Sequence, residues 1–155
     1  MKKGFTLLEM LLVIAIIAIL AGIVIVAINP AKQIADANNA QRRSDVLAIL
    51  NAIHQYGIDN AGNLSLLNIY DDDSYSDTDQ AIQGCVNDGT DASDLESYLV
   101  SSYLSAIPTD PDVSNNNGQY KVVIDSGNGR VTVCAQNTQG PDGSIVSSDY
   151  IGVTR

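Results

Sequence analysis

Residues 1–28, MKKGFTLLEMLLVIAIIAILAGIVIVAI, decide the fold of this 155-residue chain. Lys2 and Lys3 come first, and an almost unbroken apolar run then extends from Phe5 to Ile28. As an α-helix this run would be about 36 Å long, which is enough to cross the roughly 30 Å hydrocarbon core of a bilayer. Because positive residues favour the cytoplasmic side, the sequence predicts one membrane span, with the N-terminus inside and the rest of the chain exported.

Two other interpretations of this segment remain open. A cleavable secretory signal would have a shorter apolar core followed by a small-residue cleavage site, whereas here the small residue, Gly4, precedes the apolar run. A plain membrane anchor would have to tolerate Glu9, whose charge costs roughly 2.5–3.5 kcal/mol near the membrane centre and less near an end.

The stretch GFTLLE at residues 4–9, followed by a long apolar helix, resembles the class III signal of type IV pilins and pseudopilins. The resemblance implies that a membrane aspartic peptidase, the prepilin peptidase, cuts between Gly4 and Phe5 and then N-methylates Phe5. It also implies that Glu9 pairs with the new amino group of Phe5 on a neighbouring identical or related subunit. This pairing would form in the core of a helical filament that grows from a membrane-embedded assembly platform. Elementary electrostatics agrees, because a buried carboxylate persists mainly when it is paired.

The sequence after Asn29-Pro30 predicts an amphipathic continuation of the helix. Four apolar residues share one face through i, i+3, i+4, i+7 spacing: Val46, Ile49, Leu50 and Ile53. Arg42, Arg43 and Asp45 are expected on or near the opposite, polar side. Gly57 is the expected stop, since glycine commonly follows the last helical turn.

These segments predict the domain organisation. Residues 1–4 form a leader peptide, residues 5–28 the transmembrane or filament-core helix, and residues 29–56 the second half of the same helix. Residues 57–155 form an exported head. Pro30 should bend or loosen the helix because it lacks a backbone N–H.

The head is expected to contain a small antiparallel sheet, which makes the fold class α+β. Two β-rich runs, with Asn128-Gly129 in the turn between them, predict a β-hairpin over residues 119–136. Residues 145–153 are expected to add a last strand. Ser93 and Glu96 have the spacing of a capping box at the start of a short helix.

Charge and composition point to a surface protein rather than a nucleic-acid binder. The formal net charge is −10, and residues 57–155 contain three Lys or Arg against fifteen Asp or Glu. Such an acidic head stays soluble and repels nucleic-acid phosphates, so no direct nucleic-acid binding is expected.

The two cysteines, Cys85 and Cys134, both lie in the part predicted to be exported. Exported domains meet an oxidising environment, which favours a disulfide between them. Such a bridge would close a loop of about 50 residues and add roughly 3–4 kcal/mol in the chain-entropy model. Two free buried thiols are the alternative.

Enzyme and cofactor signatures are lacking: the sequence has no phosphate-binding glycine loop, nucleophile elbow or metal-ligand cluster, so we expect neither catalysis nor a cofactor. Calcium is the one metal considered, because residues 107–120 resemble a pseudopilin loop that in some members binds it. Asp110, Asp112 and Asn115–Asn117 could supply oxygens there, although such residues more commonly form turns. His54, the single histidine, is expected at the helix surface or an interface.

Three functions compete. We predict a structural subunit of a type IV pilus, which starts as a single-pass protein of the cytoplasmic membrane and ends in an extracellular filament. The alternative is a pseudopilin of a type II secretion or DNA-uptake machine. A membrane-anchored ligand-binding module that never polymerises is the distant third. The cysteines favour a pilin, and the Pro-Thr-Asp-Pro stretch at residues 108–111 favours a pseudopilin.

Overall fold

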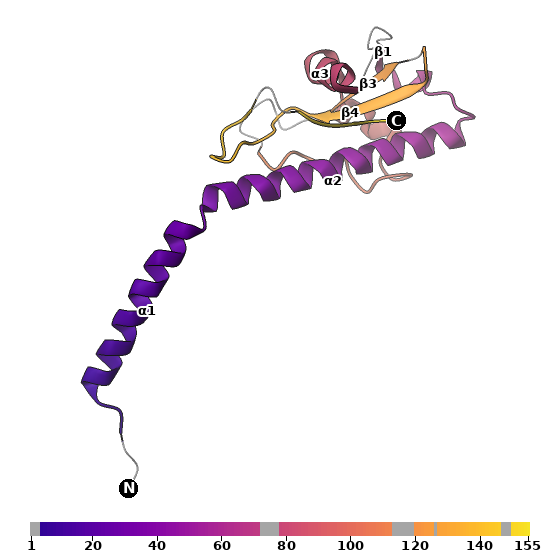
Figure 1. Cartoon of the computed structure of the whole chain (residues 1–155). Helices are drawn as coiled ribbons and strands as arrows, with labels where there is room; N and C mark the ends of the chain where they lie inside the picture. The colour runs from indigo at the N-terminus through magenta and orange to yellow at the C-terminus, as the bar shows by residue number, and fades with distance from the viewer. Residues whose placement is uncertain (1–3, 72–77, 113–119, 126, 147–149) are drawn as a thin grey trace.

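One long helix, α1 (Leu7–Ala27), projects from a mixed α/β head, and a second long helix lies along that head (Figure 1). The computed structural model describes residues 4–71, 78–112, 120–125, 127–146 and 150–155. This architecture confirms the predicted α+β class, a long N-terminal helical segment followed by a small sheet.

The predicted single helix is broken into two, α1 (Leu7–Ala27) and α2 (Pro30–Asp59). Asn29 leaves helical geometry with φ 8° and ψ 86°, and its side-chain Oδ1 accepts the Lys32 N–H at 3.3 Å. Proline has no backbone N–H and disfavours helical geometry in the residue before it, so the break falls at Asn29-Pro30. Gly22, which lies inside α1, does not interrupt it.

The helix also ends later than predicted. Gly57 stays inside α2, which continues to Asp59. A Cβ atom at position 57 would lie 3.2 Å from a Leu64 methyl carbon, so this glycine allows the following loop to pack closely against the helix rather than stopping it.

The sheet has the strand order β1-β3-β4-β5, with β2 pairing beside β3. Its strands in the described residues are β1 (Tyr70–Asp71), β2 (Thr90–Asp91), β3 (Tyr120–Asp125), β4 (Arg130–Ala135) and β5 (Ile151–Thr154). All pairs are antiparallel except β1 with β3, which is parallel. The predicted hairpin is therefore confirmed as β3–β4.

The hairpin turn follows the chemistry expected of it. Gly129 has φ +72°, a left-handed conformation that glycine adopts without strain. The Asn128 side chain accepts the Arg130 N–H at 3.1 Å. The last strand is shorter than predicted: Ile145 forms only an isolated bridge with Gln139, and residues 147–149 lie outside the described part.

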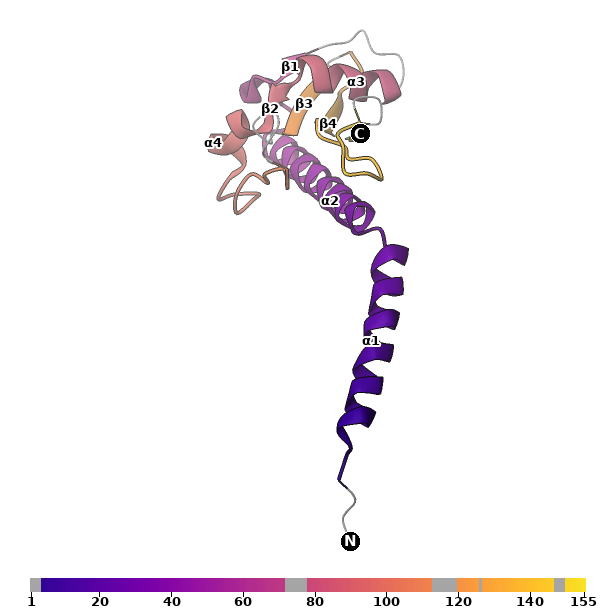
Figure 2. The ribbon, with the colours of Figure 1, turned by 90° about the vertical axis from the view of Figure 1, so that its left-hand side faces the viewer.

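Short helices complete the head: η1 (Ser65–Leu67), α3 (Thr78–Asp88), η2 (Ala92–Leu95) and α4 (Glu96–Leu99). The predicted capping box of Ser93 and Glu96 is wrong, because Ser93 lies inside η2 rather than at its N-cap. The N-cap of η2 is Asp91, whose side chain makes no cap hydrogen bond. The sheet lies between α2 on one face and α3 on the other (Figures 1 and 2).

Candidate processing and assembly site

The chain segment just before α1 is extended and accessible. Thr6 is the N-cap of α1, with φ −86° and ψ 150°, and its Oγ1 accepts the Glu9 N–H at 3.2 Å. The helix therefore starts at Leu7, two residues later than predicted. Phe5 is 71% exposed, and Gly4 is also exposed. The Gly4–Phe5 peptide bond thus lies in exposed, non-helical backbone.

Glu9 lies in the first turn of α1, where a negative charge interacts favourably with the helix dipole. Thr6 and Glu9 have the spacing of a capping box, a signal that the sequence analysis did not use. The Glu9 side chain is exposed, and neither ion pair found among the described residues involves it.

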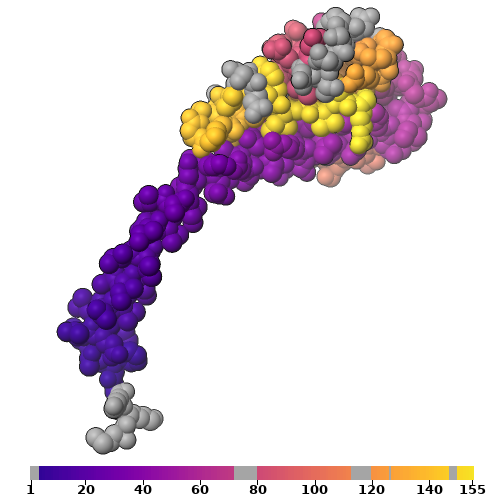
Figure 3. Space-filling model, in the orientation of Figure 1, coloured from indigo at the N-terminus to yellow at the C-terminus, as the bar shows by residue number. Residues whose placement is uncertain are grey.

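None of the 21 residues of α1 is buried by the rest of the protein. Figure 3 shows α1 projecting freely from the head. Its mean hydropathy reaches 3.3, so α1 is long and apolar enough to cross a membrane. An all-round apolar helix needs either lipid or other helices around it.

In contrast, α2 is attached to the head by a buried polar clamp, which we define as Arg42, Asn39, Asp110 and Gln139. Arg42 is fully buried and donates through Nε and Nη2 to the two carboxylate oxygens of Asp110, each at 2.7 Å. Its Nη1 donates to Asn39 Oδ1 at 2.9 Å. Asn39 in turn pairs with the backbone N–H and C=O of Gln139 at 3.0 and 2.7 Å. The clamp thus ties one helix to two loops of the head.

A second buried polar contact lies nearby on the same helix. The Tyr120 hydroxyl on β3 donates to Asp45 Oδ2 at 2.7 Å. Burial of the ring raises the pKa of Tyr120 above its usual value, and the hydrogen bond to the Asp45 carboxylate raises it further. Tyr120 therefore stays protonated and remains a donor at any physiological pH.

The prediction that Arg42 and Asp45 lie on or near the polar side of the helix is wrong, because both residues are buried. Arg42 precedes Val46 by four residues and Ile49 by seven, which is the spacing of the buried face. That periodicity was visible in the sequence, but charged residues are seldom fully buried unless paired, and the partner, Asp110, is 68 positions away.

Comparison with known proteins addresses the N-terminal segment first. Residues 1–25 match the family model of the prokaryotic N-terminal methylation motif. Type II secretion system core protein G of Aeromonas hydrophila is 30% identical over 151 residues, which cover 97% of this chain and 91% of that protein. The protein of the same name from Vibrio cholerae serotype O1 is 31% identical over 144 residues, covering 92% and 87%.

The chain belongs to the family of type II secretion system core protein G, whose members are pseudopilins. The comparisons favour the pseudopilin alternative over the surface-pilus subunit that the sequence analysis put first. No solved structure matches the chain at a significant level.

The two cysteines form the predicted disulfide. Cys85 on α3 and Cys134 on β4 have their Cα atoms 6.2 Å apart, and both residues are fully buried. The alternative of two free thiols is therefore not what the structure contains.

The structure does not test the calcium prediction, but it describes the hydrogen bonds of one residue of the candidate site, Asp110. Both carboxylate oxygens of Asp110 accept hydrogen bonds from Arg42, and Oδ1 also accepts the Asp112 N–H at 2.8 Å. Asp110 is thus committed to the clamp, and a calcium ion would depend on Asp112 and on Asn115–Asn117. These asparagines lie outside the described residues, within which no three acidic, histidine or cysteine side chains form a metal-binding group.

His54 is half-buried in the structure. It lines a shallow surface cavity with Ile53, Ile58 and Leu64. Its Nε2 is buried without a hydrogen-bond partner in the described part of the chain.

Proposed function

We propose that this protein is a structural pseudopilin subunit of a type II secretion machine, without enzymatic activity of its own. A prepilin peptidase cuts after Gly4 and methylates Phe5. The mature subunit then leaves the cytoplasmic membrane and polymerises with identical or related subunits on a membrane-embedded platform. The resulting filament stands on the outer side of that membrane and need not extend beyond the cell surface.

The observation that carries this proposal is the contrast between a completely unburied apolar helix and a well-packed head. A ligand-binding module would need only an anchor, and an anchor needs no acid at a fixed position after a glycine–phenylalanine junction. A polymerising subunit needs both, because Glu9 gives the incoming helix a defined register against the neighbour's α-amine. In the dry filament core that attraction is much stronger than at a wet interface.

The outer face of α2 extends the surface available to a second copy. Eight exposed residues repeat at intervals of three or four and carry no charge: Gln33, Ala37, Ala40, Ser44, Leu47, Asn51, Gln55 and Ile58. We expect a helix of a neighbouring subunit to pack along this face. Leu47→Lys should then lower filament yield without changing the thermal stability of the isolated subunit, and unchanged yield would argue against this contact.

Substitution of Glu9 tests the assembly step. We expect Glu9→Ala and Glu9→Gln to be exported and folded normally but to form few filaments, because the neighbouring amine loses its partner in a dry environment. Electron microscopy and immunoblots of sheared fractions measure filament yield.

The matched control is Glu96→Ala, which removes the only other glutamate from an exposed position in the head. It should assemble as the wild type does. Abundant filaments of normal length from Glu9→Ala, in cells without wild-type subunits, would reject the proposed pairing.

Mass spectrometry of the mature N-terminus tests processing. The expected product begins with N-methylated Phe5, and Gly4→Leu should leave the uncut precursor in the membrane. A mature chain that begins at any other residue contradicts this step.

Calcium binding stays a prediction that thermal unfolding can test. If Asp112 and Asn115–Asn117 bind the ion, the unfolding midpoint should be higher in calcium chloride than in a chelator. Equal midpoints would leave the protein without a calcium site.

A further inference from the structure

Two cavities adjoin at the end of the head farthest from α1. Their volumes are about 290 and 340 Å³, and they share Gly62, Leu64 and Gly129. We call the two together the distal groove. It lies between the C-terminal end of α2, the loop that follows α2 and the turn of the β3–β4 hairpin (Figure 1). Cavities of this size can accept a side chain of another molecule.

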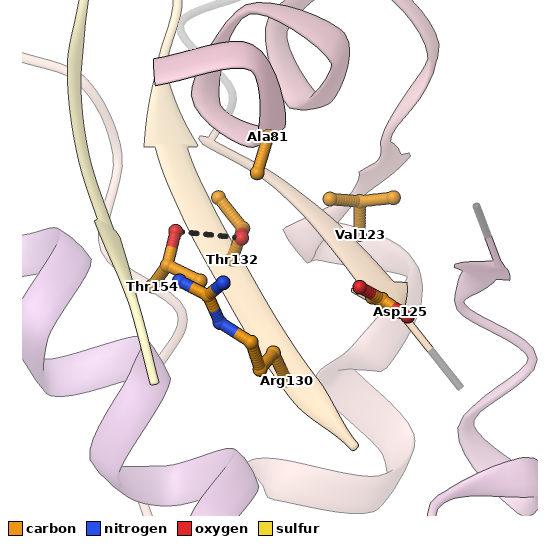
Figure 4. Close-up of a pocket in the computed structure, with 6 residues that line it drawn as sticks. All are labelled: Ala81, Val123, Asp125, Arg130, Thr132 and Thr154. Carbon is orange, nitrogen blue, oxygen red and sulfur yellow. Dashed lines mark hydrogen bonds between the residues drawn. The ribbon is translucent and has the colours of Figure 1, made fainter. Parts of the chain in front are cut away.

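The walls of the distal groove are mainly apolar. Ile124 of β3 and Val131 of β4, which pair directly, contribute to it from the face of the sheet toward α2. The next residues of the hairpin, Asp125 and Arg130, lie on the opposite face, where they line a smaller cavity with Ala81 of α3 (Figure 4). The charged ends of the hairpin therefore do not enter the groove, and none of the described residues that line it is a lysine or an arginine.

One polar atom in the groove has no partner in the described part of the chain. His54 lines the groove, and its Nε2 is buried without a hydrogen bond. Burying a polar atom without a hydrogen bond is costly, so a group that enters the groove and bonds this nitrogen would be stabilised there. The groove therefore fits an occupant that carries an apolar side chain beside a hydrogen-bonding one.

The polarity of the proposed filament indicates which part of a second copy reaches this groove. If every Glu9 pairs with the α-amine of a neighbour in the same sense, all copies point in one direction and their contacts are heterologous. The distal end of one head then faces the opposite end of another subunit, where α2 begins (Figure 1).

The start of α2 provides both kinds of side chain. Gln33 and Ile34 are uncharged and exposed, and the exposed fraction of Ile34 is 63%. Ile34 precedes Asn38 and Arg42 by four and eight positions, and the side chains of both these residues bond to the head. Ile34 therefore lies on the head-facing side of α2 but beyond the edge of the head, so its own subunit leaves it uncovered.

The charges at the two surfaces are complementary. Lys32 lies at the start of α2, and its ion pair with Asp36, at 2.8 Å, is solvent-exposed and therefore contributes little. At the distal groove, Asp71 lines one cavity, and Asp59 directly follows Ile58, which lines the other. The lysine at the start of α2 would thus approach acidic residues rather than other cations.

We propose that the distal groove receives Gln33 and Ile34 of a second copy, an inference that rests on the proposed polymerisation. Ile34 fills the apolar part of the groove, and the Gln33 amide, which can both donate and accept, bonds His54 Nε2 in either tautomer. Ile34 and Ile58 are about 36 Å apart along α2, so the two copies are displaced by about this distance. The contact is continuous with the uncharged outer face of α2, since Ile58 belongs to both.

Disulfide cross-linking of the double variant Ile34→Cys/Ile58→Cys tests the contact in assembled filaments. The two positions are too far apart for a bridge within one subunit, because bridged Cα atoms lie within about 7 Å of each other. We expect mild oxidation of sheared filaments to give a ladder of covalent multimers on a non-reducing gel, whereas each single variant gives at most dimers. The matched control, Ile34→Cys/Glu96→Cys, places its second cysteine at an exposed position outside the groove and should give no ladder.

Two results would overturn the inference. If the double variant assembles at wild-type yield but gives no ladder, the start of α2 does not occupy the groove, although the proposed function as a pseudopilin subunit still stands. If the cysteine at position 58 links to a different protein, the groove belongs to that protein. Failure of the wild type to form filaments would instead contradict the proposed function itself.

A second pair of variants covers the case in which the added cysteines block assembly. Because Ile34 is largely exposed in the subunit, Ile34→Asn and Ile34→Leu should both leave the thermal unfolding midpoint unchanged. We expect Ile34→Asn to lower filament yield several-fold, since it places an amide in the apolar part of the groove, and Ile34→Leu to keep the wild-type yield. Equal filament yields from the two variants would show that Ile34 is not buried by a second copy.

Discussion

The helices α1 and α2 are consecutive in the chain, yet they are stabilised from different sources. α1 has no buried residue, whereas α2 has eleven, including Arg42, Ile49 and Ile53. The apolar residues of α1 surround the helix, whereas the buried apolar residues of α2 lie on the face that meets the head, and Ile34, Leu47 and Ile58 of α2 are exposed. The comparison teaches that a helix apolar on all sides depends on surroundings outside its own chain, while a one-sided helix depends on its own head. Substitutions in α1 should therefore lower filament assembly without destabilising the head, whereas substitutions of buried residues in α2 should destabilise the head.

Removing the buried guanidinium should have the largest effect on folding. Arg42→Met leaves the Asp110 carboxylate buried without its partner, and we expect a loss of about 3–5 kcal/mol in the free energy of unfolding. Urea unfolding of the full chain in micelles, followed by tyrosine fluorescence, measures it, because all seven tyrosines lie beyond residue 55.

The neighbouring Arg43 is exposed and supplies the matched control. Arg43→Met should stay within about 0.5 kcal/mol of the wild type, as most surface substitutions do. If both arginine variants lose similar free energies of unfolding, the buried hydrogen bonds of Arg42 contribute no more to stability than the charge of an exposed arginine.

A pair of isoleucines compares the two helices directly. Ile49 in α2 is fully buried and Ile17 in α1 is 57% exposed. Ile49→Ala should destabilise the head by about 2–5 kcal/mol through loss of packing and a residual cavity. Ile17→Ala should leave head stability within about 0.5 kcal/mol and instead lower filament yield. Equal destabilisation in the urea assay would remove the distinction between the helices.

The smallest expected effect concerns the hydrogen bond between β3 and α2. Tyr120→Phe should cost about 1.5 kcal/mol near pH 7, since the Asp45 carboxylate loses a buried donor. Because the folded state raises the pKa of Tyr120, its contribution is complete below about pH 10 and is lost as the pH rises further. The wild type should therefore lose stability more steeply than Tyr120→Phe above pH 10, by about 1.4 kcal/mol per pH unit for one proton. If the unfolding free energies of the two proteins fall in parallel above pH 10, ionisation of Tyr120 does not contribute to the pH dependence of stability.

Local signals in the sequence predicted much of the fold. The apolar run, the helical periodicity from Val46 to Ile53 and the Asn128-Gly129 turn act over a few residues, and each led to an observed element. The disulfide was predictable because the chain has only two cysteines. The break at Asn29-Pro30 was anticipated only as a bend, since the cap formed by the Asn29 side chain depends on a backbone conformation that sequence does not show.

Long-range contacts could not be predicted. Arg42 meets Asp110, and Asp45 meets Tyr120, across 68 and 75 positions of the chain. Nothing near either residue indicates a partner, so a charged side chain on an otherwise apolar face was taken for an exposed one. At the N-terminus, the sequence indicated Gly4, Phe5 and Glu9 as the candidate site, and the roles proposed for them involve other chains, which the structure of a single subunit does not contain.

The buried Arg42–Asp110 pair also constrains how such a protein can evolve. Losing either residue alone passes through a state with an unpaired buried charge, and that cost is a large share of the roughly 5–15 kcal/mol by which a typical domain is stable. Two changes at positions 68 residues apart must then become established almost together. Among descendants of this sequence, the arginine and the aspartate should accordingly be inherited or lost as one trait, while Arg43 beside them is free to drift.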